Sequence, residues 1–151
     1  HAMVKVGLFL CCGALIFLYG KTNVDEVHGM GRKMPVTFSC FTLLSLSLIG
    51  IPPTGGFISK WYLASASLES SLGVFAWLVP VVLLASALLT AGYLLSISIH
   101  AFFPREGSAQ TMEIRKEPVL MLIPIVILAI LCLLGGLLIT ALWRFQKNIF
   151  K

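Results

Sequence analysis

Lys60 stands among uncharged residues, where a cation is costly and usually functional. It follows 26 uncharged residues, from Met34 to Ser59, and precedes eight more. A lysine at the centre of a membrane costs roughly 2.5 to 3.5 kcal/mol, so such residues are rare. Withdrawal from water favours the neutral amine, which lets a lysine take up and release a proton. The sequence therefore indicates proton transfer as its chemistry.

A break in the chain precedes Lys60, because proline lacks an amide donor and glycine frees the backbone. The residues that form it are Gly50, Pro52, Pro53, Gly55 and Gly56. Broken helices in membranes are tolerated where the free backbone groups line a polar cavity or are buried, and transporters often build ion sites there. Alternatively, residues 36–51 span the membrane alone and Lys60 snorkels at the outer interface beside Trp61 and Tyr62.

Histidine is the other side chain suited to carrying a proton near neutral pH. His1 lies four residues before Lys5 on one helical face, so a proton could pass between them. Lys5 could equally snorkel near the start of its span. For His100, near the end of an apolar segment, an interfacial position and a role in proton uptake or release are the alternatives. His28 lies in a charged loop and is expected to be solvated.

No aspartate or glutamate lies within an apolar run, although oxygen ligands are what a dehydrated sodium ion needs. A proton is therefore the predicted mobile ion, and Na⁺ is kept as a second candidate. We see no zinc spacing, haem motif, nucleotide loop or nucleophile–base pair, and expect no metal, no cofactor and no catalytic site within the chain. Four cysteines are expected to be small buried residues: Cys11, Cys12, Cys40 and Cys132.

The elements that position these residues follow from the composition. The 151 residues are 58% hydrophobic and 11% charged, against about 45–50% and 25% in soluble domains. This excludes a disordered chain, a secreted disulfide-rich module and an ordinary soluble enzyme domain. The long uncharged runs predict an all-α integral membrane fold with four transmembrane elements, the second a broken helix. The predicted spans are about 2–20, 36–68 broken at 50–56, 74–103 and 118–143.

The basic residues predict an orientation in the membrane. The net charge is +5, but the cations cluster beside the spans, so they indicate topology and no nucleic acid partner. Loops 21–35 and 104–117 carry six cations and the C-terminal tail carries three. The positive-inside rule then places both loops in the cytoplasm and the C-terminus outside, in a multi-pass protein of the inner (plasma) membrane.

Three stretches resemble the proton-translocating antiporter-like membrane subunits. Residues 1–13 resemble the HAxxK…LFLxxG helix of that family, residues 31–35 (GRKMP) its loop, and residues 50–60 (GIPPTGGFISK) its broken helix. The family includes the large membrane subunits of NADH-quinone oxidoreductase (complex I) and their homologues in Mrp-type antiporters and membrane-bound hydrogenases. The resemblance is strongest at 1–68 and only hydropathic after about 104.

The resemblance implies that the chain is the C-terminal part of a proton-conducting transporter domain built of inverted repeats. It implies that Lys5 lies near the middle of a conduction axis, that Lys60 is the terminal lysine on the broken helix near the exit half-channel, and that His1 bridges toward it. The expected function is proton conduction in an Mrp-like antiporter or an NADH-quinone oxidoreductase, with other membrane subunits and lipid as partners. The alternative is a structural membrane subunit that conducts nothing.

Overall fold

The chain is built from helices. The computed structural model describes residues 1–70, 73–103 and 117–149, and within these ranges it contains no strand. The longer helices are α1 (Ala2–Tyr19), α3 (Pro35–Ile49), α4 (Gly55–Leu68), α5 (Leu78–Phe102) and α6 (Val119–Ile149). Three short elements connect them: η1 (Val24–Val27), α2 (Met30–Lys33) and η2 (Gly73–Trp77). The predicted all-α fold is confirmed.

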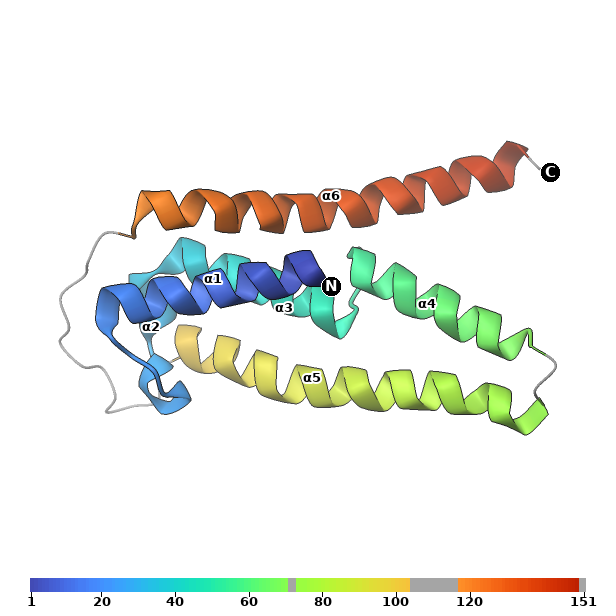
Figure 1. Ribbon diagram of the computed structural model, residues 1–151, viewed down its shortest axis with the longest axis horizontal. Coiled ribbons are helices and arrows are strands. Elements are labelled where there is room, and N and C mark those ends of the chain that lie inside the picture. The colour runs from blue at the N-terminus through green and yellow to red at the C-terminus, as the bar shows by residue number, and fades with distance from the viewer. Residues whose placement is uncertain (71–72, 104–116, 150–151) are drawn as a thin grey trace.

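Within the described ranges, three segments are long and apolar enough to cross a membrane: Ala2–Tyr19, Gly73–Phe102 and Val119–Leu142. The remaining apolar element is divided, with α3 and α4 placed nearly end to end (Figure 1). The 15 residues of α3 reach roughly 22 Å at 1.5 Å per residue. Because a bilayer core is about 30 Å thick, α3 is too short to cross it alone, and the two half-helices together form the second element.

The helix bounds differ from the predicted spans in three places. The break covers residues 50–54, and Gly55 and Gly56 already lie in the first turn of α4. α5 begins at Leu78, after the short helix η2, and α6 continues past residue 143 to Ile149. Most of the predicted loop 104–117 lies outside the described residues. The break therefore begins at Gly50, and Pro52 and Pro53 keep the helix from continuing because they lack the amide that a helix needs.

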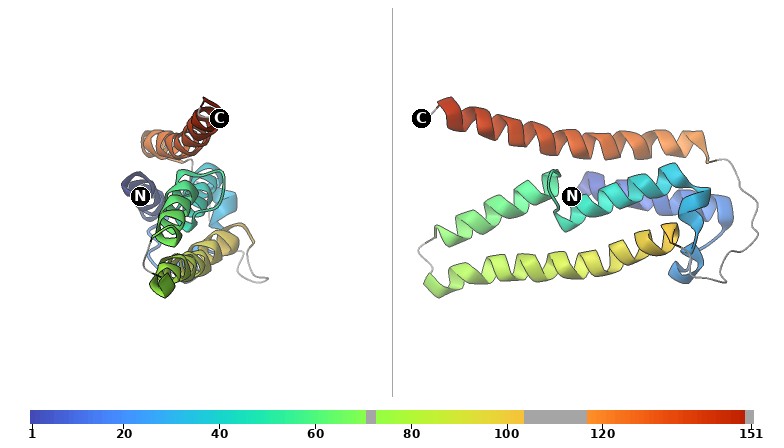
Figure 2. Two further views of the ribbon diagram at one scale, coloured as in Figure 1. Left: turned by 90° about the vertical axis from the view of Figure 1, so that its right-hand side faces the viewer. Right: turned by 180° about the vertical axis from the view of Figure 1, so that it is seen from behind.

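The two half-helices lie at the centre of the bundle. They run between α6 on one side and α5 on the other, while α1 lies along α3 and α6 (Figures 1 and 2). The loop with η1 and α2 lies at one end of the molecule, beside the last turn of α5. The C-terminal end of α4 and the short helix η2 lie at the opposite end (Figure 1).

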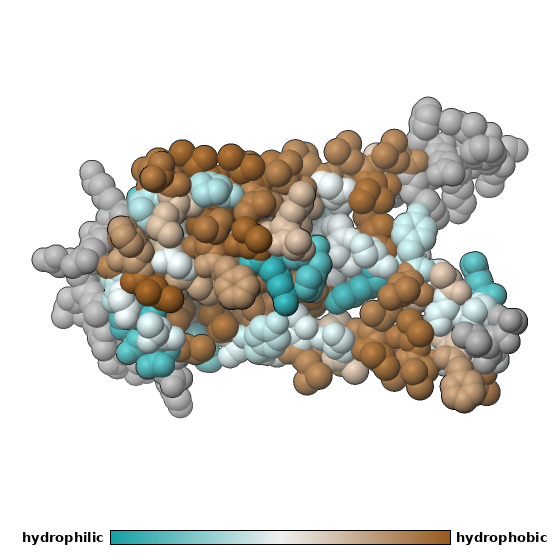
Figure 3. Space-filling view, viewed as in Figure 1, coloured by the Kyte–Doolittle hydropathy of each residue, from teal (hydrophilic) through white to brown (hydrophobic). Residues whose placement is uncertain are grey.

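The core sits at the loop end. Its largest fully buried apolar side chains are those of Met30, Met34 and Ile125. A smaller cluster of Val4, Leu44 and Ala129 joins α1, α3 and α6 beside the break. Most of the apolar surface of α5 and α6 is exposed, and the face in Figure 3 is largely hydrophobic. A surface of this size indicates contact with lipid or with other protein.

Candidate functional site

The break between α3 and α4 satisfies most of its own backbone groups. Gly50 adopts a left-handed conformation (φ 91°), and the N–H groups of Gly50 and Ile51 both donate to Leu46 O, at 3.0 and 3.1 Å. This is the usual glycine-terminated end of a helix. Thr54 then donates its hydroxyl to Ile51 O at 2.7 Å and precedes the first turn of α4. Non-helical backbone at membrane depth needs such internal partners.

Lys60 completes this arrangement from the second half-helix. Its ammonium donates to Ile49 O at 2.7 Å and to Leu48 O at 3.2 Å. These carbonyls lie in the last turn of α3. The last carbonyls of a helix have no amide partners within the helix itself. The position also places a cation at the negative end of the α3 dipole. Although Lys60 belongs to α4, its charge lies at the break.

His1 and Lys5 lie at the same level of the molecule as the break. The N-terminal end of α1 is beside the α3–α4 junction in both views (Figures 1 and 2). Both residues are exposed, and Lys5 N–H donates to His1 O at 3.0 Å within one helical turn. A hydrophilic patch interrupts the hydrophobic face beside this end of α1 (Figure 3). The side chain of Lys5 is exposed, whereas that of Lys60 is hydrogen-bonded to α3.

His100 lies far from the break, at the loop end of α5, where it contacts His28. The two rings are 4.7 Å apart between centroids and inclined by 55°. Ser96 Oγ lies 3.3 Å from His100 Nδ1, and the N–H of Gly29 donates to the His100 carbonyl at 3.1 Å. The expectation that His28 is solvated is wrong. Its ring is half-buried because the loop folds onto α5, and its Nδ1 has no hydrogen-bond partner among the described residues.

Glu117 is a polar residue outside the set of predicted site residues. Its carboxylate accepts hydrogen bonds from Thr37 Oγ1 at 2.7 Å, Thr37 N–H at 3.1 Å and Val36 N–H at 3.2 Å. It thereby supplies the acceptor that the first amides of α3 lack. The only local signal was a glutamate just before Pro118, at the edge of an apolar run. Its partners lie in a distant part of the sequence and are visible only in three dimensions.

The cysteines occupy more varied positions than expected. Cys11 is buried and donates to Thr37 O at 3.6 Å, while Cys40 and Cys132 are half-buried. Cys12 is exposed, contrary to the expectation. Among the residues that the structure describes, no three His, Cys, Asp or Glu side chains come together as metal ligands would.

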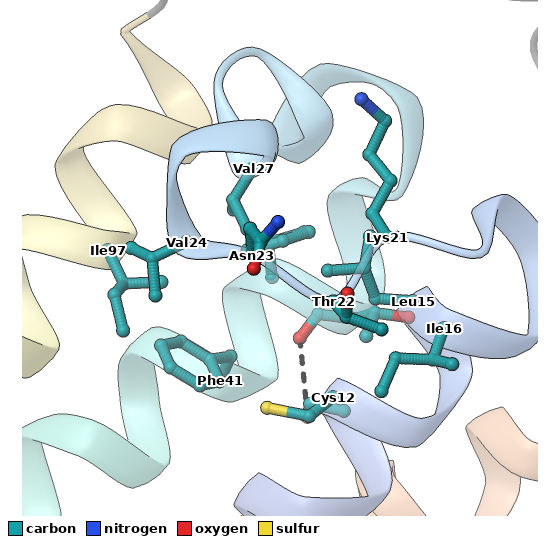
Figure 4. A pocket seen from close by; sticks show the side chains of 13 residues that line it. Cys12, Leu15, Ile16, Lys21, Thr22, Asn23, Val24, Val27, Phe41 and Ile97 are labelled. Carbon is teal, nitrogen blue, oxygen red and sulfur yellow. Dashed lines mark hydrogen bonds between the residues drawn. The ribbon is translucent and has the colours of Figure 1, made fainter.

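Two of the cavities in the described part of the chain adjoin the break and the loop end. One, of about 260 Å³, lies beside the break between α4 and α6. Its lining is Pro52, Pro53, Phe57, Ile58, Trp61, Tyr62, Ile139 and Thr140. The other, of about 120 Å³, lies at the loop end between α1, α3 and α5. Figure 4 shows Phe41 and Cys12 at this second cavity, with the amine of Lys21 directed away from both.

The comparison with protein families fits this geometry. A model described as NADH:quinone oxidoreductase/Mrp antiporter, transmembrane, matches residues 1–85. The chain belongs to this family. The matched region contains α1, α3 and α4, and so includes Lys5, the break and Lys60. Membership confirms the resemblance that the sequence motifs suggested.

Individual members of the antiporter-like family match most of the chain. It is 38% identical to NADH-quinone oxidoreductase subunit N of Desulforudis audaxviator over 148 residues, which cover 91% of the chain and 29% of that protein. It is 30% identical to F(420)H(2) dehydrogenase subunit N of Methanosarcina mazei, covering 95% of the chain and 29% of that protein. It is 29% identical to Na(+)/H(+) antiporter subunit A1 of Staphylococcus haemolyticus, covering 91% of the chain and 18% of that protein. The chain thus spans less than a third of the length of these relatives.

Proposed function

We propose that this chain is part of a proton-conducting membrane subunit, with Lys60 as a group that carries the proton. The subunit would serve a multisubunit cation/proton antiporter or an NADH-quinone oxidoreductase. The observation that carries the proposal is the pair of hydrogen bonds from the Lys60 ammonium to Leu48 O and Ile49 O, at a break within an apolar element. A titratable group within an apolar element can carry a proton, and transporters often place ion sites at broken helices.

The geometry supports a simple transfer step. The protonated amine has three N–H donors, and two carbonyls accept from it. When the ammonium passes one proton to water, the remaining neutral amine is held less strongly, because hydrogen bonds of charged donors are the stronger kind. Lys60 can then turn away from α3 and take up the next proton. His1 and Lys5, at the same level, are the proposed earlier members of the path, and His100 a site of uptake or release.

Orientation and partners belong to the same proposal. Loops 21–35 and 104–117 would face the cytoplasm and the C-terminus the outside of the inner (plasma) membrane. The exposed apolar faces of α1 and α5 would meet other membrane subunits, the rest of a longer protein, and lipid. No cofactor is proposed within this chain. A proton is the proposed ion, with Na⁺ as an ion exchanged elsewhere in the complex.

The contacts of Lys60 also favour a second candidate, a structural membrane subunit that conducts nothing. An ammonium that only caps α3 would make the same two hydrogen bonds. The two functions differ in whether the Lys60 ammonium must release its proton. Arginine separates them, because its guanidinium can supply the cap but keeps its proton under all ordinary conditions.

The test measures proton translocation by the full-length protein in its complex, reconstituted in vesicles with a pH-sensitive dye. Lys60→Arg and Lys60→Ala are each expected to lower the rate more than tenfold, as for loss of a group that transfers protons (about 10²–10⁴-fold). Assembly of the complex is quantified in parallel. Translocation at the wild-type rate by assembled Lys60→Arg would overturn the conducting role and favour the structural one.

A further inference from the structure

We propose that Gly136 of α6 is a positioning residue for Lys60. The absence of a side chain at Gly136 lets α6 lie directly against the break, and this contact fixes how far Lys60 must reach to α3. The inference rests on the proposed proton-carrying role of Lys60. It assigns to α6 a part in the path, although α6 carries none of the predicted proton-transfer residues.

The contact is made by backbone on both sides. A Cβ at Gly136 would overlap the carbonyl oxygen of Pro53, and would lie 2.7 Å from Gly55 N and 2.8 Å from the carbonyl carbon of Thr54. These are backbone atoms of the break and of the first residue of α4, which cannot turn aside as a flexible side chain does. Any larger residue at this position must push α6 away from the break or move the break.

α6 also holds the other side of the break. One turn before Gly136, Cys132 Sγ donates to Ser47 Oγ at 2.9 Å. Ser47 directly precedes the two residues, Leu48 and Ile49, whose carbonyls accept from Lys60. One face of α6 therefore contacts the end of α3 through Cys132 and the beginning of α4 through Gly136. α6 thereby holds the end of α3 and the beginning of α4 in place, although no continuous helix joins the two.

This contact of α6 with the break affects Lys60, because the Lys60 side chain must reach from α4 back to α3. Its two hydrogen bonds measure 2.7 and 3.2 Å. Hydrogen bonds weaken beyond about 3.2 Å, so the longer one has little tolerance for movement of α4. A displacement of α4 by a fraction of an ångström lengthens this hydrogen bond beyond the distance at which it is still strong. The positions of Leu48 O and Ile49 O relative to Lys60 thus depend on how closely α6 approaches.

The neighbouring residue Gly135 provides a matched control. A Cβ at Gly135 would meet nothing within 4 Å. Alanine raises helix propensity by about 1 kcal/mol over glycine at either position, so this effect is common to Gly135→Ala and Gly136→Ala. Only Gly136→Ala disturbs the break. The experiment compares both variants in the full-length protein within its complex, measuring the rate of proton translocation in vesicles across a range of pH.

Gly136→Ala is expected to lower the rate roughly tenfold or more, since misplacement of a reacting group by 1 Å can cost about 100-fold. It is also expected to shift the pH of half-maximal rate, because the proton on Lys60 loses carbonyl partners. Gly135→Ala should match the wild type both in the rate and in the pH of half-maximal rate. A merely structural role would lower the amount of assembled complex and leave the pH of half-maximal rate unchanged, and that result overturns the inference.

A second pair of variants covers the case in which Gly136→Ala does not assemble. Cys132→Val removes the donor to Ser47 and should shift the pH dependence in the same direction, whereas Cys132→Ser keeps a donor and should resemble the wild type. Equal behaviour of Cys132→Val and Cys132→Ser contradicts the inference. If Lys60→Arg translocates protons normally, the proposed function has failed. If Lys60→Arg is inactive and Gly136→Ala matches Gly135→Ala, only the positioning role has failed.

Discussion

The length of a lysine side chain decides where its charge acts. Lys60 belongs to the second turn of α4, yet its ammonium reaches back to the carbonyls of Ile49 and Leu48. The aliphatic stem passes over Gly50, where a Cβ would lie 3.0 Å from Lys60 Cδ. The spacing of residues along the sequence predicts a cation near the break. It does not predict the direction of the side chain, which depends on the fold of residues 50–54.

Gly50 is therefore expected to matter for transport and not only for stability. Alanine at Gly50 (φ 91°) should cost about 1–2 kcal/mol for the left-handed conformation. It should also displace the stem of Lys60 and reduce proton translocation several-fold in the assembled complex.

Gly20 is the control, since it too is left-handed (φ 63°) at a helix end but would place its Cβ within 4 Å of nothing. Gly20→Ala should lower the unfolding temperature without a comparable loss of translocation per assembled complex. Equal losses of translocation in Gly50→Ala and Gly20→Ala would show that the left-handed backbone conformation causes the loss and that the position of the Lys60 stem does not.

At the scale of elements, α3 is held at both ends by charges from other helices. Glu117, just before α6, accepts from the amides of Val36 and Thr37 at its N-terminus. Lys60 of α4 donates to the carbonyls at its C-terminus. Both charges match the sign of the helix dipole. A half-helix too short to span the membrane thus gains partners for the backbone groups that its ends leave free.

Neutralising Glu117 should destabilise the protein. Glu117→Gln keeps an acceptor but loses the charge, and is expected to cost about 1 kcal/mol, the usual worth of a side-chain cap at a helix N-terminus. The measurement is the unfolding temperature of the purified full-length protein in detergent. Glu69→Gln is the control, because Glu69 is exposed at the C-terminal end of α4, where a negative charge is unfavourable. A larger loss in Glu69→Gln would contradict this account.

The elements themselves were largely predictable, because uncharged runs of this length favour spanning helices. The break at Pro52 and Pro53 was predictable for the same kind of reason, since these residues lack amides. The partners of Glu117, the contact of His28 with His100 and the close approach of Gly136 were not. Each joins residues far apart in the sequence, and no local pattern encodes which helix lies beside which.

The whole molecule leaves one face of α1 uncovered. His1, Lys5 and Cys12 are exposed along it, as is Phe9 at 74%. A lysine facing lipid near the centre of a membrane would cost a few kcal/mol. The proposed proton-carrying role of Lys5 therefore requires this face to contact other protein rather than lipid.

The two ends of the bundle differ in charge, and this predicts which compartment each faces. Lys21, Arg32 and Lys33 lie at the end that carries η1 and α2, whereas the turn after α4 follows Glu69. Cationic loops stay in the cytoplasm. Two exposed positions, Thr22 and Glu69, mark the two ends. In intact cells, a membrane-impermeant maleimide should label Glu69→Cys in the full-length protein, while Thr22→Cys should react only after permeabilisation. The reverse pattern would invert the topology and place the cationic loops outside.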